Sequence, residues 1–249
     1  MLQWLDHADR RAHLLSSHVG TLYLVRHGQA AFGTDHYDRL TEIGFAQARL
    51  LGGYFARRQI RFDAVFTGTL RRQTETAQGI FEGHSDLGSA PLQESFAGLD
   101  EYKPEAIMMA LTGNFPAPAL AAARRDPVVV REHFRVLREA LLAWAEDRTQ
   151  PEGMPVWQAF QDGAVAALVE ARQRFPDGNV LIVSSGGPIA AIVAATLNAP
   201  PATAVELNLR IRNSSLTEFA ATARRHSLIS FNGLPHLDTN PDASLTTYA

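Results

Sequence analysis

The chain has 249 residues, 46% of them hydrophobic, and a net charge of −3 from 23 basic and 26 acidic side chains. This length is enough for one α/β domain with a sizeable core, and the nearly balanced charge gives no reason to expect a nucleic acid as a partner. The absence of cysteine excludes disulfides, thiolate nucleophiles and thiolate metal ligands.

The first twenty residues do not resemble a targeting segment, because charged residues such as Asp6 and Arg10 stand where a secretory signal needs an apolar stretch. No part of the chain reaches the roughly 18 apolar residues of a membrane span. We therefore expect a cytoplasmic protein that does not insert in a membrane, with residues 1–20 as an N-terminal extension and residues 21–249 as a single domain.

The first part of that domain alternates between strand and helix patterns. Thr41 is placed to cap a helix, because an apolar stripe with helical spacing begins at Phe45. The expected elements are strand 21–25, a loop over 28–37, a helix opening at Thr41, strand 62–66, a helix over 69–81 and strand 91–94.

The middle of the chain has helical patterns only, and strand patterns return after it. We interpret residues 100–155 as a helical cap insertion, because no strand pattern interrupts them. The chain as a whole therefore predicts an α/β fold, doubly wound, with a mostly parallel sheet flanked by helices. The expected elements are helices 104–111, 128–148 and 156–175, strand 179–184, helix 189–197, strands 207–212, 216–220 and 227–231, and a loosely ordered tail from Asn240.

Arg26, His27, Gly28 and Gln29 follow directly on the first predicted strand. Ligands of open α/β sheets bind at the carboxyl ends of the strands, which is where this segment lies. An imidazole can attack a phosphoryl group while an adjacent guanidinium holds the phosphate oxygens. The segment therefore indicates phosphoryl chemistry, although a polar turn at a strand end would show the same pattern.

Three later segments place polar groups at the same edge of the sheet. Arg71 and Arg72 lie in the first turn of a predicted helix, where the helix N-terminus and the guanidinium groups favour anions. Glu94 ends the third predicted strand. Ser184, Ser185, Gly186 and Gly187 form a small-residue turn into a helix, and such turns offer backbone amides to a phosphate.

These segments resemble the histidine phosphatase superfamily, the phosphoglycerate-mutase-like enzymes. The resemblance covers about residues 21–100 and 160–237. The matching positions are Leu24-Val25-Arg26-His27-Gly28-Gln29, Leu40-Thr41 with Gly44 and Gln47-Ala48, Leu70-x-Arg72 with Thr76-Ala77, Leu92-x-Glu94, residues 180–187, Asn213-Ser214-Ser215 and His236-Leu237.

The resemblance implies a role for each matching side chain. His27 would attack phosphorus and become a phosphohistidine, and Arg26 and Arg72 would bind the phosphoryl oxygens. Glu94 would protonate the leaving oxygen and then help to activate water. Gln29 and the amide of Gly186 or Gly187 would complete the phosphate site, and no cofactor or metal is implied.

This sequence departs from the family pattern at two positions. Ser185 stands where the family has a second histidine that holds the transferring phosphoryl group, and it is expected to bind phosphate as a neutral donor instead. Gly68 stands where the family has a serine. Arg71 and the late His236 are the side chains that could compensate, and the sequence leaves their roles open.

Three functions stay open. The first is a metal-independent phosphomonoester hydrolase that acts through a phosphohistidine at His27, and the second is a phosphoester-binding protein with weak or no activity. The third is a phosphoglycerate mutase. In each case the partner is a small phosphorylated substrate or inorganic phosphate, and the oligomeric state is unknown.

The cap insertion is expected to roof the site and set substrate choice. His133 in the cap and His36 in the loop after the first strand have no clear assignment from the pattern. The aromatic and methionine residues that could line the site are Phe96, Tyr102, Met108, Met109, Phe115 and Trp157.

Overall fold

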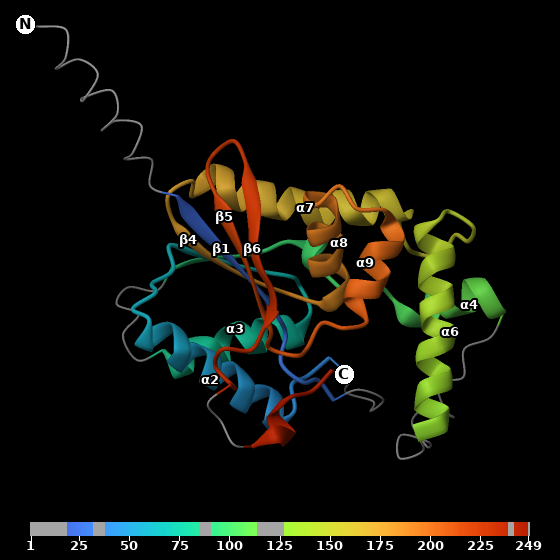
Figure 1. Cartoon of the computed structure of the whole chain (residues 1–249), viewed down its shortest axis with the longest axis horizontal. Coiled ribbons are helices and arrows are strands. Elements are labelled where there is room, and N and C mark those ends of the chain that lie inside the picture. Colours follow the sequence, from blue (N-terminus) through green and yellow to red (C-terminus); the bar gives the residue numbers. More distant parts are fainter. Residues whose placement is uncertain (1–18, 32–37, 85–90, 114–126, 239–241, 249) are drawn as a thin grey trace, which may run out of the picture.

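The computed structural model describes residues 19–31, 38–84, 91–113, 127–238 and 242–248. Six strands form one sheet in the order β3-β2-β4-β1-β5-β6, in which β1 to β4 run parallel and the β5–β6 hairpin is antiparallel (Figure 1). This confirms the mostly parallel α/β fold. The strands are β1 (Gly20–Arg26), β2 (Ala64–Thr67), β3 (Leu92–Ser95), β4 (Asn179–Ser184), β5 (Leu216–Ala221) and β6 (His226–Gly233).

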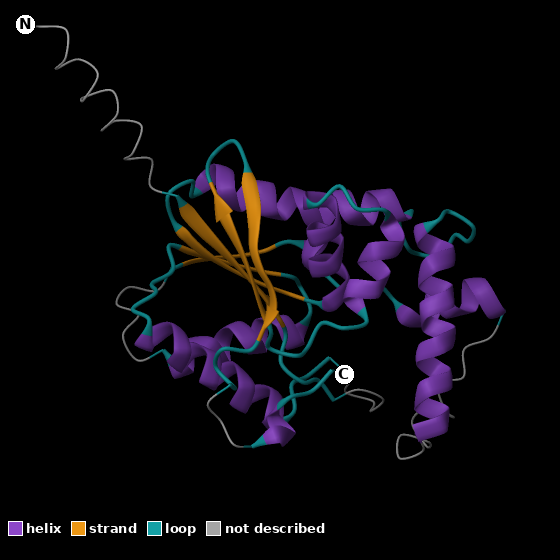
Figure 2. Cartoon of the chain, in the orientation of Figure 1, coloured by secondary structure: helices purple, strands orange, loops and turns teal. Residues whose placement is uncertain are grey.

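Helices cover both faces of the sheet, as Figure 2 shows. Alternate residues of each strand point to opposite faces, so Leu22 and Leu24 of β1 pack in one core cluster while Tyr23 and Val25 pack in another. The helices are α2 (Glu42–Arg57), α3 (Arg71–Gly83), α4 (Pro104–Thr112), α6 (Pro127–Ala145), α7 (Trp157–Arg174), α8 (Gly186–Thr196) and α9 (Pro201–Asn208).

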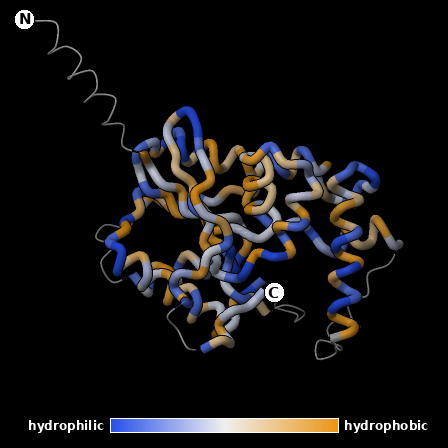
Figure 3. The backbone as a smooth tube through the Cα atoms, viewed as in Figure 1, coloured by the Kyte–Doolittle hydropathy of each residue, from blue (hydrophilic) through white to orange (hydrophobic). Residues whose placement is uncertain are grey.

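The cluster with Tyr23 and Val25 packs against α2 and α3. The larger cluster packs against α7, α8 and α9. It continues to α4 and α6, which lie together beside α9 and away from the sheet (Figure 1). In Figure 3, α6 alternates between hydrophobic and hydrophilic residues, as expected for a helix that buries only one face. None of the described helices is both long enough and apolar enough to cross a membrane.

Two glycines let the loop after β1 cross α2 at close range. A Cβ on Gly28 would lie 2.5 Å from the carbonyl oxygen of Gly44, and a Cβ on Gly44 would lie 2.2 Å from that of Gln29. Thr41 caps α2 as predicted, with its hydroxyl accepting from the amide of Gly44. The His27 turn is therefore fixed against the start of α2.

Three predictions about secondary structure were wrong. Residues 207–212 alternate apolar and polar residues like a strand, but Pro201 begins helix α9, which packs on α8 and ends at Asn208. Helix α8 begins at Gly186, three residues before its predicted start, with Ser185 at its N-cap position. The tail is not loose over residues 242–248, where Leu245 is buried and the chain turns through Ala243–Leu245.

Candidate active site

His27 is the first residue after β1 and is almost fully buried. Its Nδ1 lies 2.7 Å from the carbonyl oxygen of Gly28, which can only accept, so Nδ1 carries the proton and Nε2 keeps its lone pair. Burial lowers the pKa of His27 well below the usual histidine value, and the charges of Arg72 and Arg26 lower it further. The ring is therefore neutral at physiological pH, with an unprotonated Nε2.

Arg72 is the cation closest to that atom in the described part of the chain. Its Nε–H donates to Nε2 of His27 at 3.2 Å, and its Nη1 donates to Oδ1 of Asp38 at 2.9 Å. Asp38 also accepts from the backbone amides of Arg71 and Arg72, at 2.8 and 3.4 Å, in the first turn of α3. The helix N-terminus and Arg72 thus form an anion site that Asp38 partly fills.

Arg26, the last residue of β1, reaches the same region. Its Nη1 donates to the carbonyl oxygens of Ile211 and Tyr248, the latter at 2.6 Å. The C-terminal tail is held there by Gln47 of α2, whose Nε2 donates to the carbonyl of Leu245 at 2.7 Å. Arg26 and Arg72 both act on His27 electrostatically, so the structure brings these three predicted site residues together.

Glu101 is a second acidic side chain at this site, and the sequence analysis did not identify it. It follows β3 and the short 3-10 turn Ala97–Leu99, and its Oε1 accepts from the amide of Gly187 at 3.1 Å, in the first turn of α8. Burial raises its pKa, whereas the charges of Arg72 and Arg26 and two backbone hydrogen bonds oppose the increase. Glu101 therefore retains a proton at higher pH than an exposed glutamate does.

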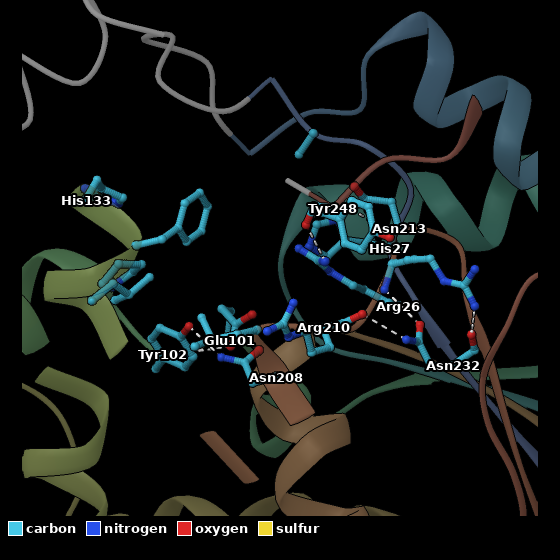
Figure 4. A pocket seen from close by; sticks show the side chains of 16 residues that line it. Arg26, His27, Glu101, Tyr102, His133, Asn208, Arg210, Asn213, Asn232 and Tyr248 are labelled. Atoms are coloured by element: carbon cyan, nitrogen blue, oxygen red, sulfur yellow. Dashed lines mark hydrogen bonds between the residues drawn. The ribbon is translucent and has the colours of Figure 1, made fainter. Parts of the chain in front are cut away.

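A cavity of about 600 Å³ opens onto these residues (Figure 4). Arg26, His27 and Glu101 lie at its polar side, while α4 and α6 contribute Pro104, His133, Phe134 and Leu137 on another side. This volume is in the range of sites that enclose small organic ligands, so there is room for more than a phosphate ion. The other lining residues are Ala30, Tyr102, Asn208, Leu209, Arg210, Arg212, Asn213, Asn232 and Tyr248.

Glu94 is not brought to His27. It pairs in register with Phe66 on β2, whose ring belongs to the core beneath α7, and its carboxylate forms two hydrogen bonds of 2.7 Å with Arg174 of α7. The arginine lowers the pKa of Glu94, which favours the ionised form rather than a proton donor. Glu94 is also absent from the described lining of the cavity.

The other three predicted phosphate ligands lie outside the described lining of the cavity. The side-chain oxygen of Gln29 accepts from the Thr41 hydroxyl at 2.8 Å, and the backbone amide of Gln29 donates to Oε1 of Gln47. Ser185 is fully buried, and its hydroxyl accepts from Nε2 of Gln73 at 3.0 Å. Gly186 is buried at the start of α8, and neither it, Ser185 nor Gln29 belongs to the described cavity lining.

The two candidates for compensation do not reach the cavity either. Arg71 is exposed and forms a 2.6 Å ion pair with Glu75 one turn along α3. His236 is buried, with its Nε2 2.9 Å from the hydroxyl of Ser214. No group of three or more potential metal-ligating side chains occurs among residues 19–31, 38–84, 91–113, 127–238 and 242–248.

Of the predicted lining residues, Tyr102 lies at the cavity, where its hydroxyl accepts from Nδ2 of Asn208 at 2.8 Å. His133 lines it as well. Phe96, Met108 and Trp157 pack in or against the core instead, as ordinary packing residues do. Met109 is exposed outside the lining. Phe115 and His36 lie outside the described residues.

One curated relative matches part of the chain. A 2,3-bisphosphoglycerate-dependent phosphoglycerate mutase from Mesorhizobium japonicum is 39% identical over 75 residues, a match that covers 27% of this chain and 36% of the mutase. The chain thus matches about a third of the length of this curated relative, so the activity of that whole enzyme is not transferred to it.

Three solved structures share the fold over most of the chain. A phosphoserine phosphatase mutant from Entamoeba histolytica, in complex with phosphoserine, has a TM-score of 0.60 and 19% identity, covering 88% of this chain and 99% of that one. Phosphoglycerate mutase from Bacillus anthracis has a TM-score of 0.59 and 20% identity, covering 89% and 96%. Bacillus stearothermophilus YhfR has a TM-score of 0.62 and 19% identity, covering 88% and 100%.

The family assignment rests on a match to most of the chain. The sequence profile of the histidine phosphatase superfamily (branch 1) matches residues 22–109 and 124–233, which include most of β1, His27 and all of α3, β4 and β5. The chain therefore belongs to the histidine phosphatase superfamily.

Proposed function

We propose that this protein hydrolyses phosphomonoesters through a phosphohistidine at His27, without a metal ion. The observation that carries the proposal is the state of His27: a buried neutral imidazole whose Nε2 lone pair lies 3.2 Å from the Arg72 guanidinium, beside Arg26 and a cavity. A nucleophile must be unprotonated, and here burial and two cations keep it so.

In the first step, Nε2 of His27 attacks phosphorus and the bond from phosphorus to the leaving oxygen breaks. Arg72 moves its N–H donors from Nε2 to the phosphoryl oxygens as the dianion enters, and Arg26 donates to the same group. These cations stabilise the charge that the transition state spreads over the equatorial oxygens. The proton stays on Nδ1 throughout, and its hydrogen bond to the Gly28 carbonyl fixes the ring.

Glu101, rather than Glu94, is the proton donor in this proposal. Its raised pKa and its place in the cavity with His27 suit a general acid, whereas Glu94 is held ionised by Arg174. Glu101 gives its proton to the leaving oxygen and then, as a carboxylate, accepts one from water. That water attacks phosphorus, the bond to Nε2 breaks with its electron pair returning to the imidazole, and inorganic phosphate leaves.

Turnover of p-nitrophenyl phosphate by His27→Ala and by the wild type tests the nucleophile. The matched control is His226→Ala on β6, outside the described cavity lining. We expect His27→Ala to be inactive, and we expect an acid-labile phosphoenzyme in the wild type only. Undiminished turnover by His27→Ala would refute the mechanism. Phosphate binding without any turnover by the wild type would favour the non-catalytic alternative.

A mutase activity is the second candidate, because the curated relative with 39% local identity is a phosphoglycerate mutase. A mutase returns the phosphoryl group of the phosphohistidine to a phosphoglycerate, whereas a hydrolase transfers it to water. Incubation with 3-phosphoglycerate and catalytic 2,3-bisphosphoglycerate distinguishes them. We expect inorganic phosphate or no reaction, and interconversion of phosphoglycerates without phosphate release would establish the mutase.

A further inference from the structure

Arg210 is a cation in the cavity that the proposed mechanism does not use. It lies two residues after the end of α9, is exposed, and lines the cavity together with Arg26 and Arg212. Within the described part of the chain, its hydrogen bonds are made by the backbone alone: the amide donates to the carbonyl of Leu207 and the carbonyl accepts from Asn232, so the guanidinium has no hydrogen-bond or ion-pair partner there. In Figure 4 its side chain extends toward the side of the cavity where Glu101, Tyr102 and Asn208 lie.

The backbone that carries Arg210 is fixed in place on both sides. Asn232 of β6 donates from Nδ2 to the Arg210 carbonyl at 2.8 Å and accepts on Oδ1 from the amide of Arg212 at 2.9 Å. The carbonyl of Ile211, the next residue, accepts from Arg26. The base of the Arg210 side chain is thus anchored directly beside the phosphoryl-binding arginine, while its charged end is available.

The charges of the cavity favour a ligand with more than one anionic group. Among the described lining residues there are three arginines and one acidic residue, Glu101, which is held by Gly187 and has a raised pKa. His27 and His133 both have lowered pKa values and so do not add charge near neutral pH. A phosphoryl group bound by His27, Arg26 and Arg72 therefore leaves the charge of Arg210 uncompensated.

The opposite wall is apolar. Pro104, Phe134 and Leu137 come from α4 and α6, and such side chains bind the hydrocarbon part of a ligand. Figure 4 shows His133, also of α6, across the cavity from Arg210. A ligand that fills the cavity therefore meets three different surfaces.

We infer that Arg210 determines substrate choice by binding a second anionic group, a carboxylate or another phosphoryl group, on the leaving group of the phosphomonoester. The inference rests on the proposed function for the position of the phosphoryl group. The leaving group then spans the cavity, with its anion at Arg210 and its apolar part against Phe134 and Leu137. Because Arg210 has no described partner to give up, an anion gains the full charge-assisted contact.

The test compares three aryl substrates: phenyl phosphate, 4-carboxyphenyl phosphate and its neutral carboxamide. We expect kcat/KM for the carboxylate to exceed that for the carboxamide by about tenfold, the size of one charge-assisted contact. Arg210→Gln should abolish this ratio by lowering kcat/KM for the carboxylate, while Arg210→Lys should keep part of it. Arg57→Gln, at the exposed end of α2, is the matched control for the loss of one positive charge.

A binding experiment separates this inference from the proposed function. Calorimetry of the three compounds with His27→Ala protein, with and without Arg210→Gln, measures recognition without turnover. If the wild type turns over none of the compounds, the phosphatase proposal is refuted. The ratio of the dissociation constants for the carboxamide and the carboxylate then decides the role of Arg210. Equal binding of carboxylate and carboxamide, or a preference that persists in Arg210→Gln, overturns the inference.

Discussion

The assignment of the proton donor gives the most decisive prediction, because the chain offers two glutamates with opposite environments. Glu101→Gln keeps an oxygen acceptor for the amide of Gly187 but has no transferable proton. General acid catalysis contributes about 10²- to 10⁴-fold, so kcat/KM for phenyl phosphate should fall by that factor. Glu94→Gln removes only an ion pair whose two side chains are 34% and 32% exposed, and we expect at most about a twofold change.

The leaving group makes the test specific for proton transfer. p-Nitrophenolate leaves without protonation, so Glu101→Gln should retain kcat/KM for p-nitrophenyl phosphate nearly unchanged. The same variant lacks the base that activates water, so kcat should fall and a burst of nitrophenol equal to the enzyme concentration should appear. Stopped-flow absorbance measures both. A uniform loss on both substrates would indicate a structural effect instead.

The pH profile supplies an independent readout of the same pair. His27 must be neutral, and its lowered pKa places the acid limb of kcat/KM below the usual histidine range. Glu101 must be protonated, and its raised pKa moves the basic limb above the usual glutamate range. Glu101→Gln should remove the basic limb for phenyl phosphate. The reasoning is refuted if Glu94→Gln removes that limb and Glu101→Gln keeps it.

Three further predictions concern the surroundings of the site. Gly187→Ala places a Cβ 2.3 Å from Oε1 of Glu101, so we expect a loss of phenyl phosphate turnover and about 1–3 kcal/mol of stability, measured by activity and urea unfolding. Ser185→His should lower the free energy of unfolding, because the larger ring overpacks against the buried Gln73. Adding Gln73→Ala should restore part of that stability, and if the two substitutions instead lower the free energy of unfolding additively in a double-mutant cycle, the two residues are not in contact. Burial lowers the pKa of His236 to about 3. Below about pH 6.5 the unfolded chain therefore binds a proton on His236 that the folded chain does not bind. The free energy of unfolding has its full value above pH 6.5 and decreases as the pH falls below it. The fall is about 1.4 kcal/mol per pH unit, and His236→Gln should reduce this slope in urea titrations from pH 7 to 4.

Much of the fold followed from local sequence patterns, because the strands are short apolar runs and the helices are long and periodic. Strand β4 was predicted at its observed bounds, and Thr41 at its observed cap. The segment 207–212 was misassigned because its alternating pattern reflects the half-buried end of a short helix and a loop. That distinction depends on the packing of α9 against α8, which no local window contains.

Glu101, the proposed acid, could not be identified from the sequence for a similar reason. Glu94 ends the strand that the sequence predicted, where catalytic residues are expected, but in the structure it lies one residue before the end of β3 and its carboxylate bonds Arg174 of α7. Glu101 lies beyond a 3-10 turn, outside any strand pattern. The sequence places Glu101 seven residues after Glu94, and this spacing alone does not identify it as a site residue. Its place in the site depends on where Gly187 lies in space.

The arrangement of partners in the site explains how two cations and a neutral histidine coexist in a buried region. Arg26 donates to carbonyl oxygens, which orient its guanidinium without neutralising it, so its charge still lowers the pKa of His27. Arg72 donates to Asp38, whose side chain is 44% exposed, and such a pair is weakened by solvent and can yield to a dianion. In the proposed function, phosphate binding therefore displaces Asp38 from Arg72, whereas Arg26 and the neutral His27 are already in place.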